Sequence, residues 1–184
     1  MPKARPVSAL LIIDMINLFD FDGGRELAAA ATRIAPAVAR LRQRFRAAGA
    51  PVVYVNDNFA QWRADFHALV AICSHPKSPG AAIASLLAPE AEDYFVLKPK
   101  HSAFLATPLP FLLANLGATR LVVTGIAADA CVLATAVDAH ARDYRVEVVR
   151  DGVASRTPAL AADALSVLSR SGAAKLVRAA RTRP

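Results

Sequence analysis

Three side chains suited to acyl transfer each lie at the end of an apolar stretch of the sequence or shortly after one. They are Asp14, Lys98 and Cys131, an acid, an amine and a thiol. A cysteine attacks a carbonyl carbon when a neighbouring base removes its proton. Asp14 is suited to accept that proton, while the ammonium of Lys98 stabilises both a thiolate and an ionised acid. Together the three residue types predict a nucleophilic site.

Cys131 lies where a predicted buried strand gives way to a helix. Residues 121–123 are apolar and mostly β-branched, which is typical of a strand buried on both faces. The chain breaks at Gly125 and favours a helix from about Asp129, so Cys131 falls in the first helical turn. Unpaired N–H groups and the helix dipole favour a thiolate there, which predicts a lowered pKa. The other cysteine, Cys73, lies within a predicted apolar helix and is expected to be structural.

Predicted strands and helices alternate along the whole chain. Strands are predicted at 7–14, 51–55, 94–97, 121–123, 145–149 and 173–177, and helices at 25–48, 64–72, 81–87, 109–116, from about 129, and 158–169. Such alternation indicates a parallel sheet covered on both faces by right-handed crossovers. The predicted fold is therefore α/β, a single domain over 1–184 with an open parallel sheet of about six strands. It is a three-layer, Rossmann-like arrangement in which 1–6 and 179–184 are loose tails.

Two prolines indicate where predicted helices begin or break. Pro36 lies inside the first long helical pattern and predicts a kink or a break into two helices. Thr157 followed by Pro158 predicts an N-cap and the first residue of the last helix.

This topology would bring the three reactive residues together. Ligands of open parallel sheets bind at the carboxyl ends of the strands. Asp14 ends the first predicted strand, Lys98 follows the third, and Cys131 follows the fourth. Each residue has a structural alternative, since Asp14 could cap a turn, Lys98 could be a solvated strand end, and Cys131 could be a small buried hydrophobe. Their joint placement favours the catalytic interpretation.

The composition indicates a globular protein, with 55% hydrophobic and 20% charged residues. No apolar run reaches the length of a membrane span, and two cysteines imply no disulfide framework, so a cytoplasmic location is expected. The net charge of +7 accompanies no nucleic-acid motif and is interpreted as a solvated helix face plus a basic tail. No membrane or nucleic-acid partner is expected. The cations concentrate at Arg33, Arg40, Arg42, Arg44, Arg46, Arg170, Lys175, Arg178, Arg181 and Arg183.

Three segments resemble those that characterise the isochorismatase-like cysteine hydrolases, a family that includes nicotinamidases and N-carbamoyl amide hydrolases. They are LIIDMIN at 11–17, LKPKHSAF at 97–104 and TGIAADACV at 124–132. The resemblance runs in the same order from Val7 to about Ser169. It implies the isochorismatase-like fold and the hydrolysis of a small amide or related acyl compound, without an organic cofactor.

The resemblance also assigns roles to residues. It implies that Cys131 is the nucleophile, Asp14 the general base and Lys98 the third member of a triad. It implies a cis peptide bond between Ile126 and Ala127, which would turn the N–H of Ala127 toward that of Cys131 to form an oxyanion hole. The reaction would pass through a thioester that water then hydrolyses.

Residues 58–63 are the best candidates for substrate selection because they follow the carboxyl end of a strand. Trp62 could stack on a flat substrate and Arg63 could bind a carboxylate, although packing or a subunit contact is the alternative for Trp62. Asn58, Phe59 and Ile126 complete the predicted substrate-binding set. His101 follows Lys98 in the same loop and is a candidate for a place near the site.

The sequence departs from the family pattern at several positions. Ile16, Leu18 and Ala128 replace a frequent glutamine, acid and threonine or serine, which predicts a more apolar pocket. Metal-dependent nicotinamidases have an aspartate and a histidine two residues apart after the second strand. Here Phe59 stands two residues after Asp57, so no metal and no nicotinamidase activity are expected.

Two other function classes remain open from sequence. One is a vinyl-ether hydrolase of the isochorismatase type, which Cys131 disfavours because such enzymes commonly lack the cysteine. The other is a non-catalytic member that keeps the fold and binds a metabolite or a protein. Rapid alkylation of Cys131 near neutral pH would favour the enzyme. The expected partners are a small-molecule substrate and further copies of the chain in a homo-oligomer.

Overall fold

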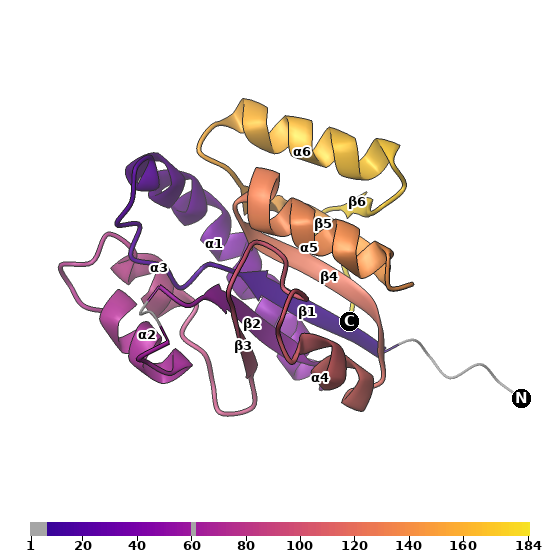
Figure 1. The fold of residues 1–184 in the computed structure, drawn as a ribbon, viewed down its shortest axis with the longest axis horizontal. Coiled ribbons are helices and arrows are strands. Elements are labelled where there is room, and N and C mark those ends of the chain that lie inside the picture. The colour runs from indigo at the N-terminus through magenta and orange to yellow at the C-terminus, as the bar shows by residue number, and fades with distance from the viewer. Residues whose placement is uncertain (1–6, 60–61) are drawn as a thin grey trace, which may run out of the picture.

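A computed structural model of the chain describes residues 7–59 and 62–184. One six-stranded sheet forms its centre, in the order β3-β2-β1-β4-β5-β6, and every neighbouring pair is parallel. Figure 1 shows the indigo strand β1 beside the orange strand β4, although more than a hundred residues separate them. The predicted α/β fold with an open parallel sheet is confirmed. The strands are β1 Val7–Ile13, β2 Val52–Asp57, β3 Tyr94–Lys98, β4 Ala118–Ile126, β5 Arg145–Ala154 and β6 Lys175–Val177.

Helices cover both faces of the sheet. Successive residues of β1 point to opposite faces, so that Leu10 and Ile12 join one hydrophobic cluster while Leu11 and Ile13 join the other. Helices α1 to α3 contribute to the first cluster and α4 to α6 to the second, which gives the three predicted layers. The helices are α1 Gly24–Ala47, α2 Phe66–Cys73, α3 Ala81–Leu86, α4 Leu109–Asn115, α5 Leu133–His140 and α6 Pro158–Arg170, with a π-helical turn η1 Ala128–Val132 and a 3-10 turn η2 Ala179–Arg181.

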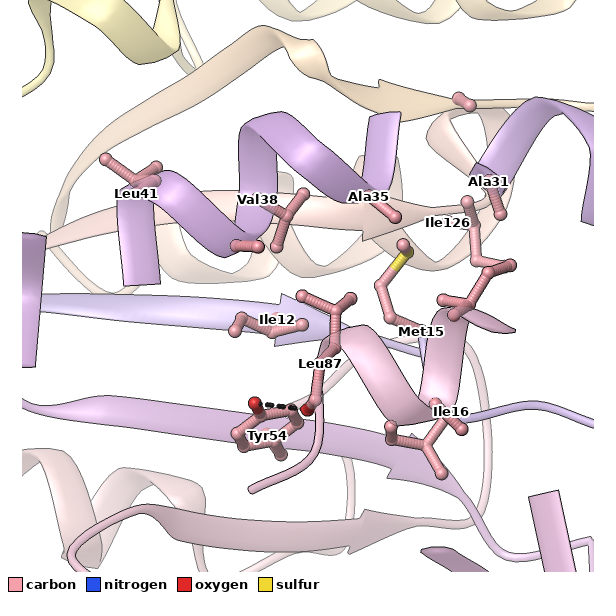
Figure 2. Close-up of a cluster of buried hydrophobic side chains, with 14 of the residues drawn as sticks. Ile12, Met15, Ile16, Ala31, Ala35, Val38, Leu41, Tyr54, Leu87 and Ile126 are labelled. Carbon is pink, nitrogen blue, oxygen red and sulfur yellow. Dashed lines mark hydrogen bonds between the residues drawn. The ribbon is translucent and has the colours of Figure 1, made fainter. Parts of the chain in front are cut away.

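The first cluster places α1 directly against the sheet. Figure 2 shows Ala31, Ala35 and Val38 of α1 facing Ile12 and Met15. The helix presents small or branched side chains at helical spacing, which allows close packing on the strands.

Ile126 belongs to the same cluster and is 1% exposed (Figure 2). Its side chain therefore packs in the core rather than in a substrate pocket, and the prediction that it contacts substrate is wrong for the side chain. Alternate residues of a strand point to the same face of the sheet, so Ile126 points to the face covered by α1, as Val122 does.

The predicted break at Pro36 is also wrong. Helix α1 continues through Pro36 without interruption from Gly24 to Ala47. Ala35, Val38 and Leu41 are buried around the proline, which itself faces solvent. Burial of this continuous apolar stripe stabilises a single helix. The stabilisation outweighs the loss of the one backbone hydrogen bond that proline cannot donate.

The C-terminal residues 179–184 are not the loose tail that the sequence predicts. The backbone N–H of Ala179 donates to the Asp151 carboxylate at 2.8 Å, and Ala179 and Thr182 are buried. Arg120 also donates to the backbone carbonyl of Arg183 at 2.9 Å. The partners in these contacts, Arg120 and Asp151, belong to β4 and β5, and local sequence patterns do not reveal such long-range contacts. Residues 1–6, the other predicted tail, lie outside the described residues, and no described helix is long and apolar enough to cross a membrane.

Candidate active site

The carboxyl ends of four neighbouring strands converge at one edge of the sheet. Asp14 follows β1, Asp57 ends β2, and Lys98 ends β3. Cys131 lies in η1, the turn that follows β4. Gly125 permits the close approach of β4 to β1, because a Cβ there would lie 2.0 Å from the carbonyl oxygen of Ile13 and its φ is +113°. The strand order thus places four polar side chains on one rim.

The structure brings Asp14, Lys98 and Cys131 into direct contact. Nζ of Lys98 lies 2.9 Å from Oδ2 of Asp14 and 3.4 Å from Sγ of Cys131. Lys98 is 0% exposed, Asp14 4% and Cys131 7%. A fully buried ammonium needs charged or polar partners, and these two side chains provide them.

Asp57 is a fourth member of this cluster that the sequence interpretation missed. Its backbone N–H donates to Oδ1 of Asp14 at 2.7 Å, and its carboxylate pairs with the ammonium of Lys98. Half of the Asp57 side chain, 51%, is exposed, so it faces the pocket. The signal was available, because Asp57 lies in the polar cluster that follows the predicted strand 51–55.

Charges and burial keep the proton on Cys131. Burial is the largest cause that raises the pKa of the thiol, and the charge of Asp14 raises it by more than the ammonium of Lys98 lowers it, so that the pKa reaches about 12. The predicted lowering by the helix dipole is therefore wrong. Cys131 lies in a short π-helical turn against a carboxylate, and desolvation outweighs the dipole.

The acid and the amine respond to the same surroundings. Burial raises the pKa of Asp14 above its ordinary value, and the positive charge of Lys98 counteracts only part of that effect. Burial alone would lower the pKa of Lys98, but the adjacent Asp14 and Cys131 raise it above its ordinary range. The site thus holds a permanent ammonium beside a carboxylate that is a stronger base than a solvated one.

His101 also contacts the sulfur. Its Nδ1 lies 3.6 Å from Sγ of Cys131, and the side chain is exposed to solvent. The candidate position of His101 near the site is confirmed. The sequence alone could place His101 in the loop after Lys98 but could not orient it.

A hollow of about 380 Å³ lies beside this cluster, and its lining includes Asp57, Lys98 and His101 but neither Asp14 nor Cys131. Its volume is suited to a small molecule. A larger hollow of about 910 Å³ lies between residues 18–21 and α2, and its lining includes none of the four polar residues of the rim. The smaller hollow is therefore the candidate substrate pocket. It is lined by Asp57, Asn58, Phe59, Trp62, Lys98, Pro99, Lys100 and His101.

Most of the predicted substrate-binding segment borders that pocket. Phe59 and Trp62 line it and are 36% and 63% exposed, so both rings are accessible to a ligand. Asn58 lines it as well, and its side-chain oxygen accepts from the N–H of Trp62 at 3.0 Å, which shapes the loop. Arg63 is exposed and is not part of the lining. Residues 60–61 lie outside the described residues.

The turn before the nucleophile has an unusual backbone. The peptide bond between Ile126 and Ala127 is cis, which is the isomer that the family resemblance implies. The carbonyl of Ala127 accepts from the N–H groups of Ala130 and Val132, both at 3.1 Å. Ser155 at the end of β5 donates to the Asp129 carboxylate at 2.5 Å, which ties this turn to the neighbouring strand. The role of the Ala127 and Cys131 amides in an oxyanion hole stays a prediction.

The histidines elsewhere have other surroundings. His67 packs edge-on against Phe95, with ring centroids 5.7 Å apart, and His75 borders the larger hollow. Over residues 7–59 and 62–184, no group of three His, Cys, Asp or Glu side chains could hold a metal ion. The buried Cys73, whose pKa burial raises to about 11, has the structural role that the sequence predicts.

Comparisons with known proteins agree with the fold. Residues 8–180 match the family model of the isochorismatase domain. The chain is 41% identical to the uncharacterized isochorismatase family protein YaaI of Bacillus subtilis, over 81% of each chain. An isochorismatase family protein from Desulfovibrio vulgaris has a similar structure, with a TM-score of 0.77, 30% identity and 96% of each chain covered. N-carbamoylsarcosine amidase from Thermoplasma acidophilum aligns with a TM-score of 0.72 and 28% identity, over 96% of this chain and 99% of the amidase.

Proposed function

The chain belongs to the isochorismatase family of hydrolases, and on that basis we propose that it cleaves a C–N bond of a small amide-like substrate through a cysteine thioester. One observation carries the proposal. A thiol, an ammonium and a carboxylate that follow or end separate strands lie in contact beside a small hollow that Lys98 lines, with Nζ of Lys98 3.4 Å from Sγ of Cys131 and 2.9 Å from Oδ2 of Asp14. The similarity to an amidase supports the choice of a C–N bond.

The first step joins the sulfur to the substrate carbon. At rest Cys131 is a thiol, because burial and Asp14 raise its pKa to about 12. As Sγ attacks the carbonyl carbon, Asp14 accepts the thiol proton. Lys98 keeps its proton and stabilises the negative charge that passes between the sulfur and the carboxylate. The amides of Ala127 and Cys131 hold the resulting oxyanion.

The second step releases the amine. Asp14 returns its proton to the departing nitrogen as the C–N bond breaks, which leaves an acyl group on Sγ and a neutral amine. A raised pKa makes Asp14 a stronger base for accepting the thiol proton, and the protonated Asp14 is then the acid that the departing nitrogen needs. Water then adds to the thioester carbon, and the C–S bond breaks to give the acid and the free thiol. The residues of the site thus return to their starting protonation.

The experiment is an ammonia-release screen over small amides, carbamoyl compounds and ureides. We expect turnover in one of these classes and a loss of about a thousandfold or more in Cys131→Ala, because the nucleophile acts as part of one unit. Cys73→Ala is the matched control, since it removes the other thiol far from the pocket.

Two results would contradict the proposal. Retained turnover in Cys131→Ala would show that the thiol is not the nucleophile. Absence of turnover over all three classes, with a folded protein that still binds small molecules, would favour a non-catalytic member of the family.

A further inference from the structure

We infer that His101 is a second base of this site and activates the water that hydrolyses the Cys131 thioester, an inference that rests on the proposed function. The sulfur of Cys131 has two different sides. Asp14 and Lys98 lie on its buried side, 4% and 0% exposed. His101 lies on its solvent side, with Nδ1 3.6 Å from Sγ.

The water of the second half-reaction enters from solvent through the hollow that His101 lines. By then the acyl group is bonded to Sγ, the atom that Nδ1 of His101 approaches to 3.6 Å. Asp14 remains behind the sulfur, held by the ammonium of Lys98 at 2.9 Å and the N–H of Asp57 at 2.7 Å. Asp57 borders the hollow too, but its carboxylate is paired with the same ammonium. His101 is therefore the uncompensated base on the side from which water arrives.

The chemistry balances with imidazole alone. A neutral histidine protonated on Nε2 presents the lone pair of Nδ1 to the pocket. Nδ1 accepts a proton from water as the water oxygen bonds to the thioester carbon. The imidazolium then gives that proton to Sγ as the C–S bond breaks, which restores the thiol and releases the carboxylic acid.

The loop that carries His101 is fastened to α5. The hydroxyl of Ser102 donates to the Asp138 carboxylate at 2.6 Å, and the backbone N–H of Ala103 donates to the hydroxyl of Thr135 at 3.0 Å. Lys98 on the other side of His101 is fully buried. The chain is therefore anchored on both sides of His101, which limits how far the imidazole can move away from Sγ.

The test uses p-nitrophenyl acetate, which reports the two half-reactions separately. The initial burst of nitrophenolate measures acylation of Cys131, and the steady rate that follows measures hydrolysis of the thioester. In His101→Gln we expect an unchanged burst and a steady rate about a hundredfold lower, the usual size of a general-base contribution. Intact-mass spectra should show the acetyl-enzyme accumulating, and added imidazole should restore part of the steady rate in His101→Ala.

Two comparisons separate a basic from a structural role. The pH profile of the steady rate should differ between the wild type and His101→Gln, whereas the pH profile of the burst should be the same in both. His140→Gln, at the exposed end of α5, is the matched control and should leave both phases unchanged.

The outcomes distinguish the inference from the proposed function. If Cys131→Ala keeps the burst, the thioester mechanism fails. If the burst is normal and His101→Gln hydrolyses the thioester at the wild-type rate, the inference about His101 is wrong. An equal slowing of both phases in His101→Gln, with no response of His101→Ala to imidazole, also overturns it, because it indicates a displaced loop.

Discussion

The proton on Cys131 is decided by burial rather than by the helix that follows it. A helix N-terminus stabilises a negative charge by about 0.3–1 kcal/mol at ordinary sites. Burial together with the charge of Asp14 raises the pKa of this thiol from 9.0 to about 12 despite the opposing charge of Lys98, a change worth roughly 4 kcal/mol. Because the larger effect opposes ionisation, the nucleophile waits as a thiol and depends on Asp14 for activation.

This balance predicts how Cys131 reacts with iodoacetamide. In the wild type the alkylation rate should be low at pH 7 and should keep rising beyond pH 10, because only the thiolate reacts. Asp14→Asn removes a charge that raises the pKa of the thiol, so alkylation at pH 8 should become at least tenfold faster. Lys98→Met removes the opposing positive charge and should slow it.

Peptide mass mapping separates the alkylation of Cys131 from that of Cys73, which is 0% exposed and should stay unlabelled in the folded protein. A wild-type rate that levels off below pH 8 would contradict the expected protonated thiol. Slow labelling at neutral pH, which the sequence suggested as the mark of a binding protein, is expected here of the enzyme as well.

At the scale of elements, strand ends were predictable and the partners of side chains were not. Polar residues that close apolar strands identified Asp14 and Lys98, because parallel strands present their carboxyl ends at one edge. The pairing of Lys98 with Asp57 depends on β3 lying next to β2, and the alternating pattern does not specify the order of strands. The orientation of His101 depends on anchors in α5, which no local pattern reveals.

Helix α1 provides a prediction at this scale. Pro36 faces solvent within a continuous helix, so its ring makes no buried contact that a substitution would lose. Pro36→Ala supplies the missing N–H, and an interior proline costs about 3 kcal/mol relative to alanine. The proline also restricts the unfolded chain, and losing this restriction lowers the free energy of unfolding by about 1 kcal/mol. We expect Pro36→Ala to raise the free energy of unfolding by about 1–2 kcal/mol.

Urea unfolding measures this effect as a higher midpoint with an unchanged slope. Arg33→Ala and Arg40→Ala, on the exposed face of the same helix, are matched controls and should change the midpoint little. A midpoint that stays constant or falls in Pro36→Ala would show that α1 has adapted its packing to the proline.

Across the whole molecule, the alternation of strands and helices predicted the layers, while long-range contacts determined the rest. The sheet places its reactive rim between four strands from the first three quarters of the sequence. The C-terminal residues pack because Asp151 and Arg120 bind their backbone, and these partners lie far away in sequence. Composition indicated a globular chain but could not specify such contacts.

Two thiols, two tyrosines and the buried amine Lys98 share one direction of pKa shift. Burial raises the pKa of Cys73 to about 11, that of Cys131 to about 12, and those of Tyr54 and Tyr144 above their ordinary 10.0. The pKa of Lys98 is raised as well, because its carboxylate and thiol neighbours outweigh burial. In each case the folded protein holds a proton that the unfolded chain releases at lower pH.

The free energy of unfolding should therefore fall as the pH rises above about 9. Stability contributed by a raised pKa is complete below the ordinary value and is lost as the pH rises toward the folded value. Between pH 9 and 10 each of the two thiols should lower the free energy of unfolding by about 1 kcal/mol.

Urea titrations in the presence of a reductant measure this decline. In Cys73→Ala the free energy of unfolding should decline less steeply with pH, because one of the two thiols is gone. The cavity left by the substitution lowers the free energy of unfolding equally at every pH, so it does not change this slope. A free energy of unfolding that stays level to pH 10.5, or an unchanged slope in Cys73→Ala, would show that the interior does not hold these protons more tightly than water does.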